Sequence, residues 1–270
     1  MAIFYWKGGA SPTGLWQSSG NWAKDEALAV GAGDYPHSAT DIAVFTGSAS
    51  DDCTEFGEAI SIAALIDFTA YGGSGRLTAT DDTLTVGLAS FLGSSSANDV
   101  SIIGNCIFSG PDCTNSGTIV GNCIFSNGSD NYGTITGDCI FDGSGTNNHG
   151  TITGDCIFSG GSSRNQTGAT INGNCIFNSS SGRNYGTVNG DCIFASSSRN
   201  FSNGIVTGTC VSKSNSSHLS TSTVNGNAIF HTETGIQTGM TINGSLVPLV
   251  PVTATGTIGK KPLDVIGAGI

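Results

Sequence analysis

The chain has 270 residues and a mass of 27.2 kDa, which is enough for a sizeable core in one or two domains. Only 11% of the residues are charged and 41 are glycine, a composition that excludes a coiled coil or a helical bundle. The formal net charge of −11 argues against a nucleic acid or an anionic membrane as partner, because phosphate groups attract concentrated basic residues.

The N-terminus and the cysteines indicate the compartment. Met1 to Gly9 lack the charged segment followed by an apolar stretch of about 7 to 15 residues that an export signal requires. No apolar run reaches the ~20 residues that cross a bilayer. Seven of the nine cysteines occupy one repeated position, which predicts reduced, buried thiols and not a disulfide framework. We therefore expect the chain to stay in the cytoplasm where it is made.

Residues 1–58 are predicted to form an N-terminal cap, because the open hydrophobic end of a repeat stack must be covered. They contain all three tryptophans and a G-x-W-x(4)-N-W…P…D…F-x-G pattern. The pattern is formed by Gly14, Trp16, Asn21, Trp22, Pro36, Asp41, Phe45 and Gly47. This opening resembles that of many bacterial surface solenoids and of phage structural proteins. The resemblance covers residues 1–90, implies an architecture, and carries no catalytic residues to transfer.

From Ser101 onward, a Cys-Ile-Phe segment recurs about every 17 residues. Its first position is occupied by Cys106, Cys123, Cys139, Cys156, Cys175, Cys192, Cys210 and Ala228. Each repeat has a β-branched run, a glycine, this segment and a turn rich in Ser, Gly and Asn, which is typical of one coil of a solenoid. We predict an all-β parallel β-helix (β-solenoid) over residues 59–245, with regular repeats at 101–245.

Alternate residues of a strand point to opposite faces, so the Ile of each Cys-Ile-Phe strand lies on the face opposite to the Cys and Phe. Whichever face is turned to the core, the other leaves an apolar stripe on the outside. Such a stripe is larger than monomers normally expose, and two further copies around a threefold axis are its simplest cover. A dimer or a folded-back terminal segment would also cover it. With Cys and Phe inside, the interface candidates are Ile107, Ile124, Ile140, Ile157, Ile176, Ile193, Val211 and Ile229.

The turns contain two further repeated positions. The first predicts a ladder of side-chain hydrogen bonds between coils. It comprises Asn115, Asn131, Asn148, Asn165, Asn184 and Asn200. The second, expected to stack beside it, comprises Tyr132, His149, Tyr185 and Phe201. Arg164, Arg183, Arg199 and Lys213 also lie in the turns. Arg183 and Arg199 occur at a similar phase and are candidates for a small polar patch, but we interpret the four residues as isolated charges.

Some parallel β-helices cleave polysaccharides, which makes the carboxylates the candidates for chemistry. Asp138 and Asp155 occupy equivalent positions in adjacent coils, with Asp191 two coils further on. Other coils have Asn or Thr there, which favours a polar ladder over catalysis or Ca²⁺ binding. Histidines are scattered and cofactor fingerprints are absent, so no catalytic residue, metal or cofactor is predicted. Ice-binding solenoids display rows of Thr on a flat face. Thr134–Thr136 and Thr151–Thr153 match this pattern, but the following coils do not, which argues against ice binding.

Residues 246–270 are predicted to form a C-terminal cap or docking tail. Pro248 and Pro251 lack backbone N–H groups, so we expect the parallel ladder to stop at Leu246. The apolar end of the chain resembles the short tails of some virion proteins. The docking-tail candidates are Leu263, Val265, Ile266 and Ile270.

These features lead us to expect a non-enzymatic structural component of a virus particle. The resemblance implies a trimeric phage capsid decoration protein, head fibre or spike, made in the host cytoplasm and located in the virion. Its expected partners are its own copies and a capsid or other virion protein, with host surface polysaccharide as a further candidate. The alternatives are a tail spike that binds or depolymerises polysaccharide, and a cell-surface adhesin. A β-solenoid fold by itself does not determine one function.

Overall fold

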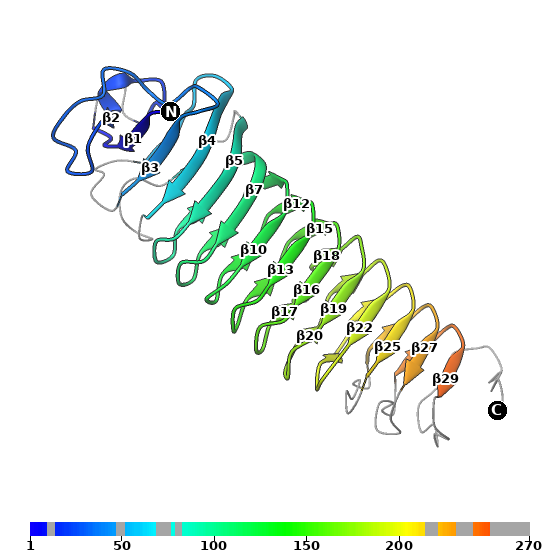
Figure 1. Ribbon diagram of the computed structural model, residues 1–270. Helices are drawn as coiled ribbons and strands as arrows, with labels where there is room; N and C mark the ends of the chain where they lie inside the picture. The colour runs from blue at the N-terminus through cyan, green and yellow to red at the C-terminus, as the bar shows by residue number, and fades with distance from the viewer. Residues whose placement is uncertain are drawn as a thin grey trace. The chain divides into compact units, whose positions relative to one another are not determined.

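The computed structural model describes residues 1–9, 14–46, 52–68, 77–78, 83–213, 221–230 and 240–248. The described chain is all-β, and its parallel strands form a β-solenoid, as the sequence predicts (Figure 1). Its helical structure consists of a single 3-10 turn, η1 (Ser19–Asn21), within the described residues. Two compact units divide the chain, Met1–Gly137 and Asp138–Ile270.

The first unit combines an irregular N-terminal segment with the first coils. Its strands are β1 (Ile3–Trp6), β2 (Trp22–Ala23), β3 (Ile42–Phe45), β4 (Ile60–Asp67), β5 (Thr83–Phe91), β6 (Ala97–Asn98), β7 (Ser101–Phe108), β8 (Thr114–Asn115), β9 (Thr118–Val120), β10 (Cys123–Phe125), β11 (Asp130–Asn131) and β12 (Thr134–Thr136). β2 pairs antiparallel with β1, whereas β1, β3, β4, β5 and β7 pair in parallel in that order. The parallel ladder therefore begins inside the predicted cap.

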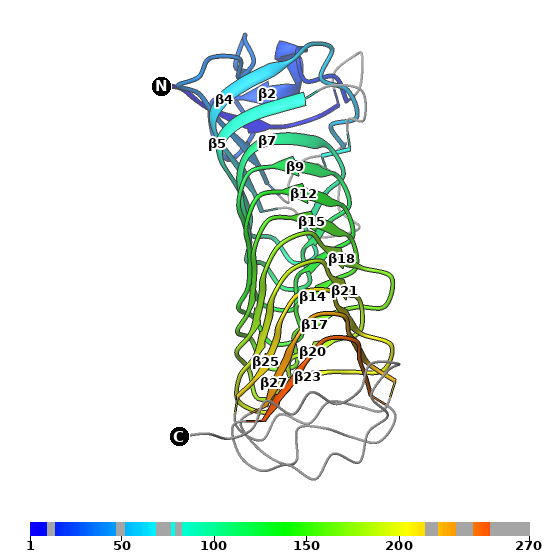
Figure 2. The ribbon, with the colours of Figure 1, turned by 90° about the vertical axis from the view of Figure 1, so that its right-hand side faces the viewer.

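In the second unit each regular coil contributes short strands to parallel ladders. The Cys-Ile-Phe ladder consists of β13 (Cys139–Phe141), β16 (Cys156–Phe158), β19 (Cys175–Phe177), β22 (Cys192–Phe194), β25 (Cys210–Ser212), β27 (Ala228–Phe230) and β29 (Leu246–Pro248). A second ladder consists of β15 (Thr151–Thr153), β18 (Thr170–Ile171), β21 (Thr187–Val188), β24 (Ile205–Val206), β26 (Thr223–Val224) and β28 (Thr241–Ile242). The third consists of β14 (Asn147–Asn148), β17 (Arg164–Asn165), β20 (Arg183–Asn184) and β23 (Arg199–Asn200), seen one beside the next in Figure 2.

The Cys and Phe side chains of each Cys-Ile-Phe strand point into the core. In the second unit, the Phe158 ring lies 4.6 Å from the rings of both Phe141 and Phe177, within 10° of parallel. In the first unit, Phe108 stacks in the same way between Phe91 and Phe125. Because equivalent residues pair in register, one aromatic per coil builds a continuous stack, and such contacts contribute about 0.5–1.5 kcal/mol each beyond burial. The orientation with Cys and Phe inside is therefore the observed one.

A glycine turns the chain just before each Cys-Ile-Phe strand. At Gly190 a Cβ would overlap the carbonyl group of Gly173, the equivalent glycine of the preceding coil. Gly121 in the first unit faces the carbonyl oxygen of Gly104 in the same way. Stacked coils therefore leave no room for a side chain at this corner, which explains why the repeat has glycine there.

The predicted asparagine ladder is confirmed within each unit. Asn165 donates its side-chain N–H to the Oδ1 of Asn184 at 2.8 Å and accepts from Asn148 at 2.9 Å. In the first unit Asn115 has the same role between Asn98 and Asn131, with both distances 2.8 Å. These amides are buried. Because buried polar groups are costly without partners, the ladder fixes the register of the coils.

The expected end of the parallel ladder at Leu246 is wrong. β29 pairs in parallel with β27, and Pro248 lies opposite Phe230. Pro248 is the last residue of the last described strand, a position in which a missing N–H is tolerated. The docking-tail candidates Leu263, Val265, Ile266 and Ile270 lie outside the described residues.

Candidate functional site

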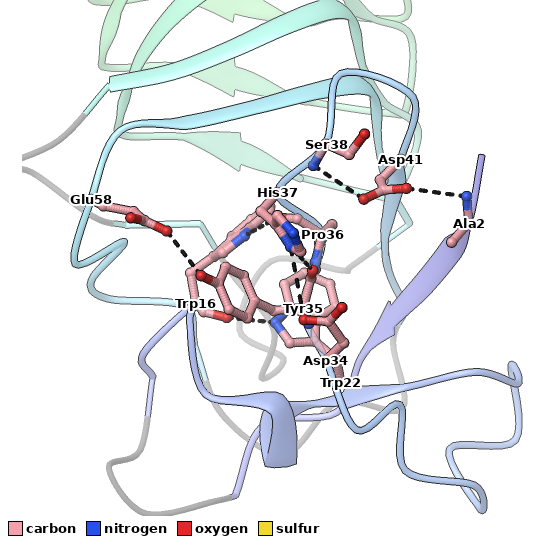
Figure 3. Close-up of polar contacts among 10 residues, drawn as sticks. All are labelled: Ala2, Trp16, Trp22, Asp34, Tyr35, Pro36, His37, Ser38, Asp41 and Glu58. Carbon is pink, nitrogen blue, oxygen red and sulfur yellow. Dashed lines mark hydrogen bonds and ion pairs between the residues drawn. The ribbon is translucent and has the colours of Figure 1, made fainter.

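The tryptophans of the N-terminal pattern are held by specific hydrogen bonds (Figure 3). Trp16 donates its indole N–H to the Pro36 carbonyl oxygen at 2.8 Å, and Trp22 donates to the Trp16 carbonyl oxygen at 2.6 Å. Both indoles are buried. The Trp16 ring also packs at 4.7 Å against Trp22 and at 5.3 Å against Phe56. This cluster closes the N-terminal segment around aromatic side chains.

Asp41, Asn21 and Phe45 of the pattern have structural roles as well, and Gly47 lies outside the described residues. The two Asp41 carboxylate oxygens accept hydrogen bonds from the backbone N–H groups of Ala2 and Ser38, at 3.2 and 3.1 Å (Figure 3). Asn21 donates to the Leu15 carbonyl oxygen at 2.9 Å, and Phe45 stacks on Trp6. The pattern therefore describes how this segment packs.

Exposed titratable side chains gather beside the tryptophans. The Tyr35 hydroxyl donates to the Glu58 carboxylate at 3.0 Å, and this hydrogen bond raises the pKa of Tyr35. His37 Nδ1 lies 2.7 Å from the Tyr35 carbonyl oxygen and 3.8 Å from the Asp34 carboxylate. Each of these groups is engaged with a neighbour, and together they brace the turn that carries Pro36 (Figure 3).

The corner carboxylates connect adjacent coils. Asp138 Oδ1 accepts the backbone N–H of Asp155 at 2.8 Å, and Asp155 Oδ1 accepts that of Asn174 at 2.7 Å. Asp191 Oδ1 accepts the N–H of Thr209 at 2.7 Å. An asparagine oxygen forms the same bond, since Asn174 accepts from Asp191 at 3.0 Å, which explains the exchange of Asp and Asn. The predicted polar ladder is confirmed.

In the part of the chain that the structure describes, no three His, Cys, Asp or Glu side chains lie close enough together to hold a metal ion. All nine cysteines are buried and free of disulfides. Burial raises the pKa of Cys156, Cys175 and Cys192, and raises that of Cys210 to about 12. Thiols with raised pKa values stay protonated at neutral pH and are unreactive.

The interface candidates form an outward row on each unit. Ile140, Ile157 and Ile176 are 38%, 39% and 38% exposed and follow one another in register. Ile193, Val211 and Ile229 continue this row half-buried, and Ile107 and Ile124 form its counterpart in the first unit. The row is one residue wide, because the alternate positions on either side belong to polar residues such as Asp155 and Ser159. We name it the isoleucine row.

The interpretation of the arginines as isolated charges is wrong, whereas the similar phase of Arg183 and Arg199 is confirmed. Arg164 pairs in register with Arg183, and Arg183 pairs with Arg199, so the three form one row on the outside of the third ladder. We name it the arginine row. The signal was the ladder asparagine that follows each arginine directly in three successive coils.

Aromatic side chains flank the arginine row. Arg183 donates from Nη1 to the Tyr185 hydroxyl at 3.0 Å, and its Cζ lies 4.8 Å from the centre of the Phe201 ring. The rings of Tyr185 and Phe201 are 4.9 Å apart and tilted. The expected stacking is therefore confirmed for this pair.

The outer face of the first strands is hollowed by an apolar groove of about 330 Å³. β1, β3 and the end of β4 provide most of its lining, which includes the exposed apolar side chains of Ile3 and Phe68. Glu26 and Thr46 contribute polar groups to its lining.

The chain matches no family model, no curated protein and no solved structure. No helix among the described residues is long and apolar enough to cross a membrane.

Proposed function

We propose that this protein is a non-enzymatic structural component of a virus particle that assembles as a homotrimer through its isoleucine row. The observation that carries the proposal is this outward, in-register apolar row on a chain with so few charged residues. Water-exposed isoleucine in a continuous line favours association, because each buried CH₂ group contributes ~0.8 kcal/mol.

The dimensions of the row favour a narrow seam with polar margins. A stable interface buries ~800 Å² per partner, more than one line of partly exposed isoleucines provides. The Asx and Ser side chains on either side would complete the contact, in the usual arrangement of an apolar centre and a polar rim. A threefold arrangement needs only such a seam on each copy.

The roles of the polar side chains favour a structural over an enzymatic function. Asp138, Asp155 and Asp191 already accept backbone hydrogen bonds between coils. The nine thiols are buried, and raised pKa values keep the strongly shifted ones protonated. The location in a virus particle is supported by the resemblance of the N-terminal pattern to phage structural proteins.

Light scattering of the purified protein tests the trimer. We expect a mass of three times 27.2 kDa for the wild type and of 27.2 kDa for Ile157→Asp. Thr153→Asp is the matched control, because this exposed residue lies in the same coil on another ladder. A monomeric wild type, or an Ile157→Asp protein that keeps the wild-type mass, would contradict the trimer.

Immunoelectron microscopy tests the location. We expect antibodies raised against the purified chain to label regular virus particles. Labelling confined to cell envelopes would contradict the location in a virus particle and favour a cell-surface adhesin.

A further inference from the structure

The arginine row concentrates positive charge on an acidic chain. The protein has nine Lys and Arg residues against 20 Asp and Glu, yet three arginines occupy successive strands of one ladder. Neighbouring strands lie ~4.8 Å apart, so their like charges repel. Within the described ranges no carboxylate forms an ion pair with any of the three. No described carboxylate of the chain therefore neutralises these three charges.

The side chains around the row hold it in place without neutralising it. Arg183 is fixed by the Tyr185 hydroxyl and the Phe201 ring, which leaves most of its five N–H donors available. The Nε of Arg164 is shielded from water and has no hydrogen-bond partner among the described residues. On the same ladder, Asn147 accepts a hydrogen bond from Gln166 at 3.1 Å. Among the described residues of the second unit, the outward groups next to the row are amides, hydroxyls, rings and the His149 imidazole, and none is acidic; in the first unit the corresponding strand position is occupied by Asp130.

We propose that the arginine row binds an acidic oligosaccharide, a chain of sugars that carry carboxylates. Guanidinium groups recognise carboxylates with two parallel hydrogen bonds. The strand spacing of ~4.8 Å is comparable to the length of one pyranose ring, so successive sugars reach successive arginines. Tyr185 and Phe201 offer rings beside the row on which sugar C–H faces pack. The site lies on a different ladder from the isoleucine row and does not depend on the trimer.

The charge of the whole chain favours this ligand over a nucleic acid. Polyphosphate binding needs a broad basic surface, whereas the net charge here is −11. A short oligosaccharide with one carboxylate per sugar engages only the row itself.

Calorimetric titration with a hexamer of galacturonic acid tests the proposal, with neutral maltohexaose as the ligand control. We expect the hexagalacturonate to bind the wild type, with affinity that falls as salt rises, and the neutral hexamer not to bind. The triple variant Arg164→Gln, Arg183→Gln, Arg199→Gln is expected to lose at least tenfold in affinity. The corresponding triple Arg→Lys variant keeps the charge but loses the paired hydrogen bonds, and is expected to fall between the two.

Single substitutions distinguish binding by the arginine row from attraction by positive charge elsewhere on the protein. Arg183→Gln is expected to weaken binding several-fold, whereas Lys24→Gln removes one exposed charge from the first unit and is expected to change nothing. Circular dichroism of each variant verifies the fold. The proposal would be overturned by an absence of hexagalacturonate binding, by an unchanged affinity in the triple Gln variant, or by tighter binding of a six-nucleotide DNA strand. A change of mass in the triple Gln variant would also overturn it, because the row would then belong to a contact between copies.

Discussion

The N-terminal segment and the repeated coils both bury aromatic rings, but by different geometry. Trp16 and Trp22 meet edge to face at 4.7 Å, and each indole N–H has one particular carbonyl partner. Phe141, Phe158 and Phe177 instead lie parallel, each against the same residue of the next coil. The stability of the N-terminal segment therefore depends on individual side chains with unique contacts, whereas the coils repeat the same contact from one coil to the next. Repeats of this kind obtain their stability as a sum of neighbour interactions.

The largest expected effect concerns the N-terminal segment. Trp16→Ala removes the ring that contacts Trp22 and Phe56 and leaves the Pro36 carbonyl without its donor. We expect a loss of about 3–5 kcal/mol in the free energy of unfolding, measured in urea. Trp16→Phe keeps most of the packing and should lose less than half as much. Equal losses for both variants would mean that the hydrogen bond, and not the packing, holds this segment.

A substitution at a coil corner should cost somewhat less. Gly190→Ala forces a Cβ against the Gly173 carbonyl group, and overpacking of this kind costs about 1–3 kcal/mol. Gly161→Ala is the control in the same unit, because the nearest atom to its new Cβ is 3.7 Å away. Thermal unfolding of the two variants measures the difference. If both are equally stable, the coils are less tightly stacked than described.

The asparagine ladder offers a comparison between a buried and an exposed amide. Asn165→Ala breaks side-chain hydrogen bonds to Asn148 and Asn184 and should lose about 2 kcal/mol in urea unfolding. Asn189→Ala breaks an exposed bond to Asn172 and should lose less than about 0.5 kcal/mol. A reversed order would show that the ladder does not set the register.

The pH dependence of stability should also change when a buried thiol is removed. Burial raises the pKa of Cys210 from 9.0 to about 12, so above pH 9 the unfolded chain releases a proton that the folded chain retains. This thiol's contribution to stability is fully present below pH 9 and is lost as pH rises towards 12, by ~1.4 kcal/mol per pH unit.

Replacing this thiol tests the linkage. Cys210→Ala places there the residue that Ala228 already provides in the next coil. Urea unfolding under reducing conditions between pH 8 and pH 10.5 should therefore give a shallower decline than in the wild type. Parallel declines for the two proteins would contradict the linkage.

The sequence predicts the solenoid well because its period is visible in single residues. Cys156, Ile157 and Phe158 repeat with the coil, so alternation alone indicates which neighbours share a face. Arg183 and Arg199 are recognisable at a similar phase, but the row with Arg164 was missed because the intervals differ, 19 residues from Arg164 to Arg183 and 16 from Arg183 to Arg199. The predicted ladder of Asn165, Asn184 and Asn200, each directly after an arginine, carries the signal for its register, and the strand pairing confirms it. The contacts of Trp16 and Asp41 could not be predicted in this way, because the N-terminal segment has no repeat that indicates which of its residues lie together.

In the proposed trimer, adjacent residues of one strand have different partners, Phe158 within the chain and Ile157 between copies. The most direct test is cross-linking of Ile157→Cys under mild oxidation, analysed by non-reducing gel electrophoresis beside the wild type and Thr153→Cys. We expect intermolecular disulfides only in Ile157→Cys, because the nine native thiols are buried and Thr153 lies on another ladder. Equal cross-linking of both variants, or none in Ile157→Cys, would contradict the isoleucine row as the surface where copies meet.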